Sequence, residues 1–379
     1  MSIFENTTLI IGAGAHVPYG FPTSQQLTRT IKQLVSTDAG GITSASGSTH
    51  DHWPEIRHDK HRIAKLILDA DVITRPSNPR SSNEHDINIG KVLDEFVLSF
   101  GRSQVYSIDA YLKVITESGS ENDGLKAKIG KLLISYFIKK SEDRCPIGFH
   151  YEGFDWIQYI INEFLTKDLK KFFECPPRVF SFNYDNLFER SIWEHLVHYH
   201  KMSEQQAKQM VLGLKIRHIY GHIGTLENPF LLTDVRGHLA AINNIKVIGE
   251  ERDTAALDGM AEEIIDSILH ADQVLFLGFG FDDLNTQLIY RKLCKEPDTL
   301  KDIQEYCRHQ RRAATNIGRS LHEIQSLQKR LPFFIDFHAT SQGLEQIDCL
   351  KLIREKAPIF QPSPKRGMTR LASHLRHPQ

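Results

Sequence analysis

The stretch that decides the fold is residues 7–24, TTLIIGAGAHVPYGFPTS. A β-branched apolar run, Thr7–Ile11, stops at the turn Gly12-Ala13-Gly14, and a second turn of small and rigid residues, Gly20-Phe21-Pro22, follows it. Glycines let a backbone approach an anion closely, and the free N–H groups of a following helix start point at that anion. The stretch therefore predicts a strand, a phosphate-binding turn and a helix, which together would bind a nucleotide.

The helix after these turns is predicted over residues 25–35, with Thr23 or Ser24 as its cap. The turn is not the one found in ordinary dehydrogenases. That fingerprint needs a third glycine where Val17 stands, and an acidic residue about 20 residues further on at a strand end. Asp38 lies near that distance, but in a stretch rich in Gly, Ser and Thr. A nicotinamide oxidoreductase is therefore disfavoured.

Composition is that of a globular protein with one large domain or two: 379 residues, of which 25% are charged and 40% hydrophobic. The formal net charge of −1 gives no general attraction to nucleic acid or to an anionic membrane. Five scattered cysteines without a C-x-x-C pair argue against a disulfide framework and a four-cysteine zinc site, so we expect no metal. The first residues do not read as a signal peptide, and the longest apolar run, Val274–Phe281, is too short to cross a membrane. We expect a cytoplasmic protein.

The order of elements predicts an α/β fold with a Rossmann-like parallel sheet, because short apolar runs alternate with segments of helical periodicity. The predicted strands are Thr7–Ile11, Arg178–Phe182, Ile216–His222, Ile245–Ile248 and Val274–Leu277, with a late one at Phe333–Phe337. Residues 12–177 are far more than one crossover helix needs, so a helical module is expected after the first βα unit. The predicted division is a core of residues 1–37 and 176–360, an inserted module of 38–175, and a mobile basic tail of 361–379. Residues 302–330 are predicted to be a basic helical segment.

Polar residues follow three of these strands where a ligand would bind, since open α/β sheets bind ligands beyond the carboxyl ends of their strands. Asn183 and Asp185 follow the second strand, and alternation in the third would place His218, Tyr220 and His222 on one face. The fifth strand ends in a glycine turn at Gly278 and Gly280, after which Asp282 or Asp283 can cap a helix. Each segment alone also fits an ordinary turn or helix cap. Asp109 is interpreted as part of a capped helix start, with contact to the ligand cleft as the less favoured alternative.

These segments, in this order, resemble the sirtuin superfamily. Its first loop is GAG, five residues, then glycine–aliphatic–proline; its catalytic strand ends in an asparagine two before an aspartate; its next strand ends in a histidine–glycine pair. The resemblance implies that Gly12, Ala13, Gly14, Gly20, Phe21, Pro22, Thr23, Tyr220, Gly278, Gly280 and Asp282 contact NAD, and that Asn183, Asp185, His218 and His222 carry the chemistry. Alignment on the glycine of the pair places Tyr220 at the catalytic histidine position, so His222 and His218 remain alternative bases.

Because it lacks the zinc cysteines and has a long helical insertion, the chain resembles bacterial sirtuin-like antiphage effectors. The resemblance implies an NAD glycohydrolase that cleaves NAD to nicotinamide and ADP-ribose and depletes the infected cell. It also implies a homo-oligomer and a partner such as a HerA-type ATPase. The basic segment and tail suggest nucleic acid only weakly. The alternatives are a module that binds NAD or ADP-ribose without turnover, and a protein deacylase, which the absent zinc cysteines disfavour.

Overall fold

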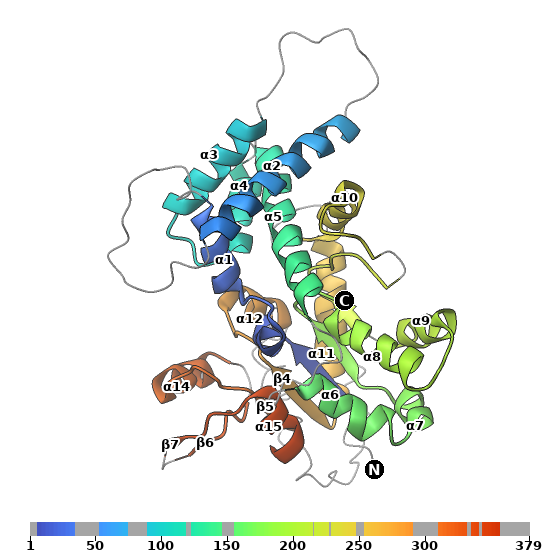
Figure 1. The fold of residues 1–379 in the computed structure, drawn as a ribbon. Coiled ribbons are helices and arrows are strands. Elements are labelled where there is room, and N and C mark those ends of the chain that lie inside the picture. The colour runs from blue at the N-terminus through green and yellow to red at the C-terminus, as the bar shows by residue number, and fades with distance from the viewer. Residues whose placement is uncertain are drawn as a thin grey trace.

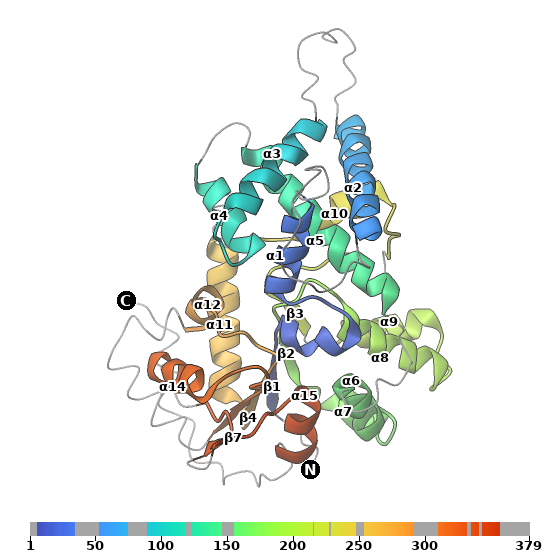
Figure 2. The ribbon, with the colours of Figure 1, turned by 60° about the vertical axis from the view of Figure 1, so that its left-hand side comes forward.

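A five-stranded parallel sheet forms the centre of the computed structural model, which describes residues 6–34, 53–74, 89–118, 123–145, 155–214, 216–226, 229–247, 254–290, 310–331, 335–340 and 343–356 (Figures 1 and 2). The strand order is β3-β2-β1-β4-β5. The strands are β1 (Thr7–Ile11), β2 (Arg178–Ser181), β3 (Ile216–His218), β4 (Gln273–Leu277) and β5 (Arg311–Ala314). The predicted α/β fold with a Rossmann-like parallel sheet is confirmed.

Strand β1 lies in the middle of the sheet, and all five of its residues are buried, as are those of β4 beside it. Such continuous apolar runs are typical of parallel strands covered on both faces. Ile11 pairs with Ser181 of β2 on one side and with Leu277 of β4 on the other. The chain order reverses between β1 and β4, which is where doubly wound sheets bind their ligands.

One predicted strand is not formed by its described residues, and one observed strand lies in a segment predicted to be helical. Residues 245–247 form no strand; instead, the Lys246 N–H donates to the Tyr220 carbonyl at 2.9 Å, outside the sheet. The fifth strand is Arg311–Ala314, inside the segment predicted to be helical, and a helix follows only at α14 (Leu321–Arg330). Two arginines begin this strand and conceal its buried character, because Ala313 and Ala314 are its only apolar residues. Residues 302–309 and 332–334 lie outside the described residues. Over the described part of the predicted late strand, residues 335–337, the structure has a bridge between Asp336 and Ala313.

A layer of helices lies above the carboxyl ends of the strands (Figures 1 and 2). Helix α5 is packed against α10, α4, α3 and α2, while α1 contacts α3, α4 and α5. The layer therefore includes helices from both sides of the predicted insertion at 38–175. Its members are α1 (Ser24–Gln33), α2 (Trp53–Thr74), α3 (Ile89–Arg102), α4 (Ile108–Ser118), α5 (Asp123–Arg144) and α10 (Val235–Asn244).

The remaining helices flank the sheet or lie beside it (Figures 1 and 2). They are α6 (Trp156–Ile160), a π-helical turn (Ile161–Leu165), α7 (Leu169–Glu174), α8 (Leu187–His198), α9 (Glu204–Leu212), α11 (Thr254–His270), α12 (Asp283–Tyr290), α15 (Cys349–Lys351) and a second π-helical turn (Leu352–Lys356). A small hairpin, β6 (Ala339–Thr340) and β7 (Gly343–Leu344), follows α14.

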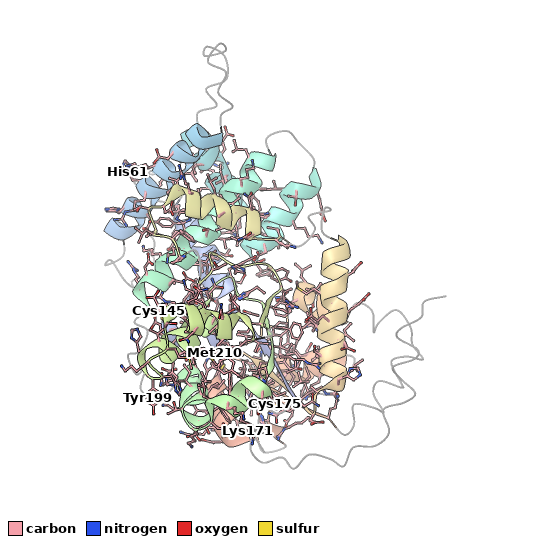
Figure 3. The ribbon with its side chains drawn as sticks, turned by 90° about the vertical axis from the view of Figure 1, so that its right-hand side faces the viewer. His61, Cys145, Lys171, Cys175, Tyr199 and Met210 are labelled. Carbon is pink, nitrogen blue, oxygen red and sulfur yellow. The ribbon has the colours of Figure 1, made fainter. Side chains whose placement is uncertain are left out.

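The described cysteines, Cys145, Cys175 and Cys349, are all free thiols, and Figure 3 shows the first two well apart. Among the described residues, no helix combines the length and the apolar character that crossing a membrane would require. The predicted tail, 361–379, lies outside the described residues.

Candidate functional site

The two glycine turns at the switch point of the sheet pack directly on each other. The Gly12 N–H donates to the Leu277 carbonyl at 2.9 Å, and the Gly14 N–H donates to the Gly278 carbonyl at 3.0 Å. A Cβ on Gly12 would lie 2.7 Å from the Gly278 oxygen, and one on Gly278 would lie 1.8 Å from the Ala15 nitrogen. These glycines are therefore needed for backbone-to-backbone packing between the loops after β1 and β4, whatever else they bind.

The rest of the first loop is two short 3₁₀ turns, Ala13–Ala15 and Val17–Tyr19, that end at Gly20 with a left-handed φ of 84°. Thr23 then caps α1: its side chain accepts from the Gln26 N–H at 3.2 Å, and the Gln26 side chain accepts from the Thr23 N–H at 2.8 Å. The predicted strand and capped helix are thus confirmed, with Thr23 as the cap, and phosphate binding by the turn between them stays a prediction. This capping box uses two donors at the helix start.

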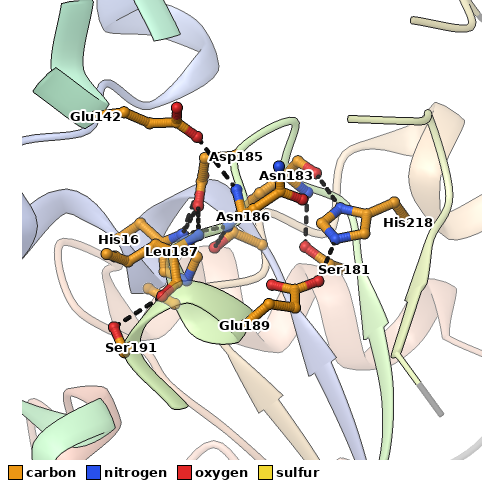
Figure 4. A network of polar contacts seen from close by, with 12 residues as sticks. His16, Glu142, Ser181, Asn183, Asp185, Asn186, Leu187, Glu189, Ser191 and His218 are labelled. Atoms are coloured by element: carbon orange, nitrogen blue, oxygen red, sulfur yellow. Dashed lines mark hydrogen bonds and ion pairs between the residues drawn. The ribbon is translucent and has the colours of Figure 1, made fainter. Parts of the chain in front are cut away.

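Asn183 and Asp185 lie at the carboxyl end of β2 and face the first loop (Figure 4). The Asn183 Nδ2 is 3.4 Å from the Gly12 carbonyl oxygen and 3.1 Å from Nδ1 of His16, and Asp185 lies 2.8 and 3.0 Å from the same Nδ1. All three side chains are buried, with exposures of 5%, 2% and 3% for Asn183, His16 and Asp185. The imidazole that meets the Asn183 amide is therefore that of His16.

His16 is the functional candidate that the sequence analysis missed. It lies among the five residues between the two turns, which the motif treats as a spacer. Its ring is stacked on Trp156, with centroids 6.1 Å apart, and the Trp156 indole N–H donates to the Ala15 carbonyl at 2.8 Å. A polar ring in an otherwise apolar and glycine-rich turn was the available signal.

Asp185 remains ionised. Burial opposes its charged form, but the ring of His16 and the Leu187 N–H, which donates to it at 3.0 Å, together hold the pKa of this carboxyl below its usual value. The carboxylate is thus a fixed negative charge at the strand end, and it also accepts from the N–H of the first residue of α8.

His218 is held at the end of β3 by two partners (Figure 4). Its Nδ1 is 3.0 Å from the Asn183 carbonyl oxygen, and its Nε2 is 2.6 Å from Glu189 of α8. Burial disfavours the charged ring, but the carboxylate of Glu189 outweighs burial and raises the pKa of His218 to about 9. Both ring nitrogens therefore carry protons at neutral pH and donate to these two oxygens.

His222 lies beside His218, with ring centroids 5.2 Å apart, and its Nδ1 contacts the Gly224 carbonyl. Burial and the positive charge of His218 lower the pKa of His222. The ring is therefore neutral at pH 7, with its Nδ1–H bound to the carbonyl and the lone pair on Nε2.

Tyr220 does not share a face with the two histidines, which corrects the expected alternation. Strand β3 ends at His218, and Gly221 turns the chain with a φ of 72°. The Tyr220 hydroxyl donates to Asn285 of α12 instead, and its ring packs edge-on against Phe182. Burial, Asp109 and Asp282 raise its pKa, so the phenol stays protonated.

Asp109 of α4 reaches the loop that follows β2. Ser107 caps this helix by accepting from the Ala110 N–H at 3.1 Å, which leaves Asp109 to accept from the Tyr184 hydroxyl at 2.5 Å. Asp282 caps α12 through the Asn285 N–H at 3.0 Å, as its position after the glycine turn predicts. Tyr220, from the third predicted strand, and Asp282, from the turn after the fifth, thus both contact Asn285.

The structure places the predicted residues in two groups. One holds Asn183, Asp185, His218 and His222 together with His16, which was not predicted. The other holds Tyr220 and Asp282 together with Asn285, which was not predicted either. Two buried polar atoms of the first group, His16 Nε2 and Asn183 Oδ1, have no hydrogen-bond partner among the described residues. Buried polar atoms are nearly always paired, so such a cluster is typical of a binding site. No group of three potential metal-ligating side chains occurs in the described ranges.

Comparisons with known proteins agree with this location. No curated protein and no solved structure matched the chain. The family model for the SIR2-like domain matches residues 177–323, a segment that begins just before β2 and contains Asn183, the two histidines and the loop after β4. This part of the chain is similar to the SIR2-like domain, which supports a sirtuin-like family and a function that uses NAD.

Proposed function

We propose that this protein is an NAD glycohydrolase, which uses water to cleave NAD into nicotinamide and ADP-ribose. The observation that carries the proposal is the position of Asn183. Its amide lies 3.4 Å from the first glycine turn, at the switch point of a Rossmann-like sheet and within the segment similar to the SIR2-like domain. A dinucleotide held by that turn would present its ribose to this amide.

The reaction breaks the bond between the ribose anomeric carbon and the nicotinamide nitrogen, and nicotinamide leaves with the electron pair. The ribose passes through a cationic state, as in glycoside hydrolysis, before the water oxygen bonds to the same carbon. In the proposed mechanism, Asn183 holds the ribose and the water, and the buried charge of Asp185 stabilises the cation. The loops at Gly12–Gly14 and Gly278–Gly280 hold the pyrophosphate and the remaining ribose.

The water must lose a proton, and His222 is the candidate base whose protonation state fits. Its neutral ring keeps a lone pair on Nε2, because Nδ1 donates to the Gly224 carbonyl. His218 carries a proton up to a pKa of about 9, and Tyr220 retains its own, so neither accepts a proton at pH 7.

The test is release of nicotinamide from NAD, measured by chromatography, for wild type, Asn183→Ala, His222→Gln and the control Asn162→Ala. Asn162 is an exposed residue of the π-helical turn, distant in sequence from the strand ends. We expect Asn183→Ala to lower kcat by about 100-fold or more, and Asn162→Ala to leave it unchanged. The assay is run with and without a HerA-type ATPase and on each oligomer separated by size, because the proposed homo-oligomer and partner would control turnover. Equal turnover by wild type and Asn183→Ala would contradict the assignment.

A second candidate is a module that binds NAD or ADP-ribose without turnover. The observation in its favour is Tyr220, whose hydroxyl is held by Asn285 at the position that the alignment gives to a catalytic histidine. Calorimetric binding of NAD with no nicotinamide released in any assembly state would support it. The proposed role in defence is tested separately: cells that express the protein should lose NAD on phage infection, and cells expressing Asn183→Ala should not.

A further inference from the structure

His16 is joined to both key residues of the β2 strand end through a single atom. Its Nδ1 lies 2.8 and 3.0 Å from the two oxygens of Asp185 and 3.1 Å from the amide nitrogen of Asn183 (Figure 4). The ring has no freedom to move away, because it is 2% exposed and enclosed by Trp156, Tyr19 and Phe21 at centroid distances of 6.1, 6.3 and 5.9 Å.

One ring nitrogen cannot serve both neighbours in the same way. Nδ1 either carries a proton and donates, or has a lone pair and accepts. Asp185 is an ionised carboxylate, so it only accepts, and Nδ1 must carry the proton. The Asn183 amide nitrogen is also a donor, so at 3.1 Å it packs against this N–H without a hydrogen bond between them, and it donates to the Gly12 carbonyl instead. The amide nitrogen lies between this ring and the Gly12 carbonyl, and the amide oxygen is left without a protein partner in the described part of the chain.

We propose that His16 is a positioning residue: held by Asp185, it fixes the Asn183 side chain so that the amide faces the reacting ribose. This inference rests on the proposed function and adds a residue to it. Asp185 then acts on the reaction in two ways, through its charge and through the ring that it orients. Displacing a reacting group by about 1 Å can cost 100-fold in rate, so the expected effect lies in kcat rather than in KM.

The first experiment compares three substitutions of His16. In His16→Asn the amide nitrogen stands three bonds from Cα, as Nδ1 does, and can still donate to Asp185. In His16→Gln it stands one bond further, and His16→Phe keeps the ring but has no donor. We expect His16→Phe and His16→Gln to lower kcat about 10- to 100-fold with KM within about threefold, and His16→Asn to recover most of the loss.

The matched control is His238 of α10, another buried histidine with aromatic neighbours. It is 1% exposed, and it bonds Ser135 at 2.8 Å and the Leu232 carbonyl at 2.9 Å. We expect His238→Phe to lower stability but to leave kcat and KM unchanged. Thermal melts of every variant separate lost folding from lost positioning.

The deciding measurement is made in the Asn183→Ala background. If His16 acts through Asn183, His16→Gln causes no further loss of activity there, whereas a purely structural role would lower activity equally in both backgrounds. Additive losses, or equal kcat values for His16→Asn and His16→Gln, would overturn the proposal.

A second readout does not need activity. In protein labelled with ¹⁵N-asparagine, the Asn183 side-chain signals are identified by their loss in Asn183→Ala. We expect their amide protons to exchange with solvent at the wild-type rate in His16→Asn and faster in His16→Gln. Should wild type release no nicotinamide, the proposed function fails while this measurement still judges His16: equal exchange rates in the two variants would reject it.

Discussion

At the scale of single residues, nearby backbone atoms and the backbone conformation explain why glycines occur in the two turns. Gly278 combines a left-handed φ of 56° with a Cβ position 1.8 Å from the Ala15 nitrogen. Gly20 has a φ of 84° but open space around its Cβ position. The same residue type thus meets two different constraints, one steric and one conformational.

We expect Gly278→Ala to lower the free energy of unfolding by about 2–4 kcal/mol, because the backbone of the first loop would have to move. Gly20→Ala should cost only about 1–2 kcal/mol, the price of the left-handed conformation. Gly259→Ala, on an exposed position of α11 with open space, is the control and should be neutral or slightly stabilising. Urea unfolding of the three variants measures these differences; a Gly278→Ala loss no greater than that of Gly20→Ala would contradict the packing argument.

At the scale of elements, α8 is joined to the end of β3 by the ion pair between Glu189 and His218. The pair is largely buried, with side chains 14% and 8% exposed. The pKa of His218 rises from 6.5 to about 9 in the folded protein, so folding favours the protonated ring. Its stabilising contribution is complete below about pH 6.5 and is lost as the pH rises through 9.

Glu189→Gln should therefore lower the free energy of unfolding by about 2–4 kcal/mol at pH 6.5 and by much less at pH 10. The control is Glu263→Gln, which breaks the exposed pair with Arg217, whose side chains are 45% and 55% exposed. Exposed pairs contribute about 0–1 kcal/mol, so this variant should change little at either pH. Denaturant unfolding at the two pH values is the measurement, and a Glu189→Gln effect that grows toward pH 10 would rule out the pair.

At the scale of the whole molecule, the helical layer reaches the candidate site through two carboxyl groups. Asp109 of α4 accepts from the Tyr184 hydroxyl, and Glu142 of α5 accepts from the Asn186 N–H at 3.4 Å (Figure 4). Burial raises the pKa of both, that of Glu142 to about 7. The layer therefore fixes the loop after β2, and its contact with that loop depends on pH.

For Glu142, the folded-state pKa of about 7 lies above the ordinary value of 4.5, so stability is lost as the pH rises through 7. Glu142→Gln keeps an acceptor for Asn186 without the charge. We expect it to be more stable than wild type by about 1–3 kcal/mol at pH 8, with a smaller difference at pH 5. Melting temperatures at both pH values test this, with Glu117→Gln of α4, 56% exposed, as the control. A variant less stable than wild type at pH 8 would contradict the assignment.

Much of the fold could be predicted from local pattern. The runs at Thr7–Ile11 and Val274–Leu277 are strands, and Thr23 caps the helix after the first turn. The strand at Arg311–Ala314 was not predicted, because its only apolar residues are two alanines. Its burial depends on β4 beside it, which the local sequence does not show. The expected common face of His218, Tyr220 and His222 failed because alternation holds only while the strand continues, and β3 ends at His218.

The sequence by itself determined the parallel α/β architecture, the glycine turns and the asparagine at the strand end, because each depends on neighbours within a few residues. Only the tertiary structure decided which imidazole meets that asparagine. His16 and Asn183 are 167 residues apart, and it is the pairing of β2 with β1 that brings the two loops together. Protonation states were decided there as well. Glu189, on another element, keeps His218 charged against the effect of burial, while burial and the charge on His218 keep His222 neutral.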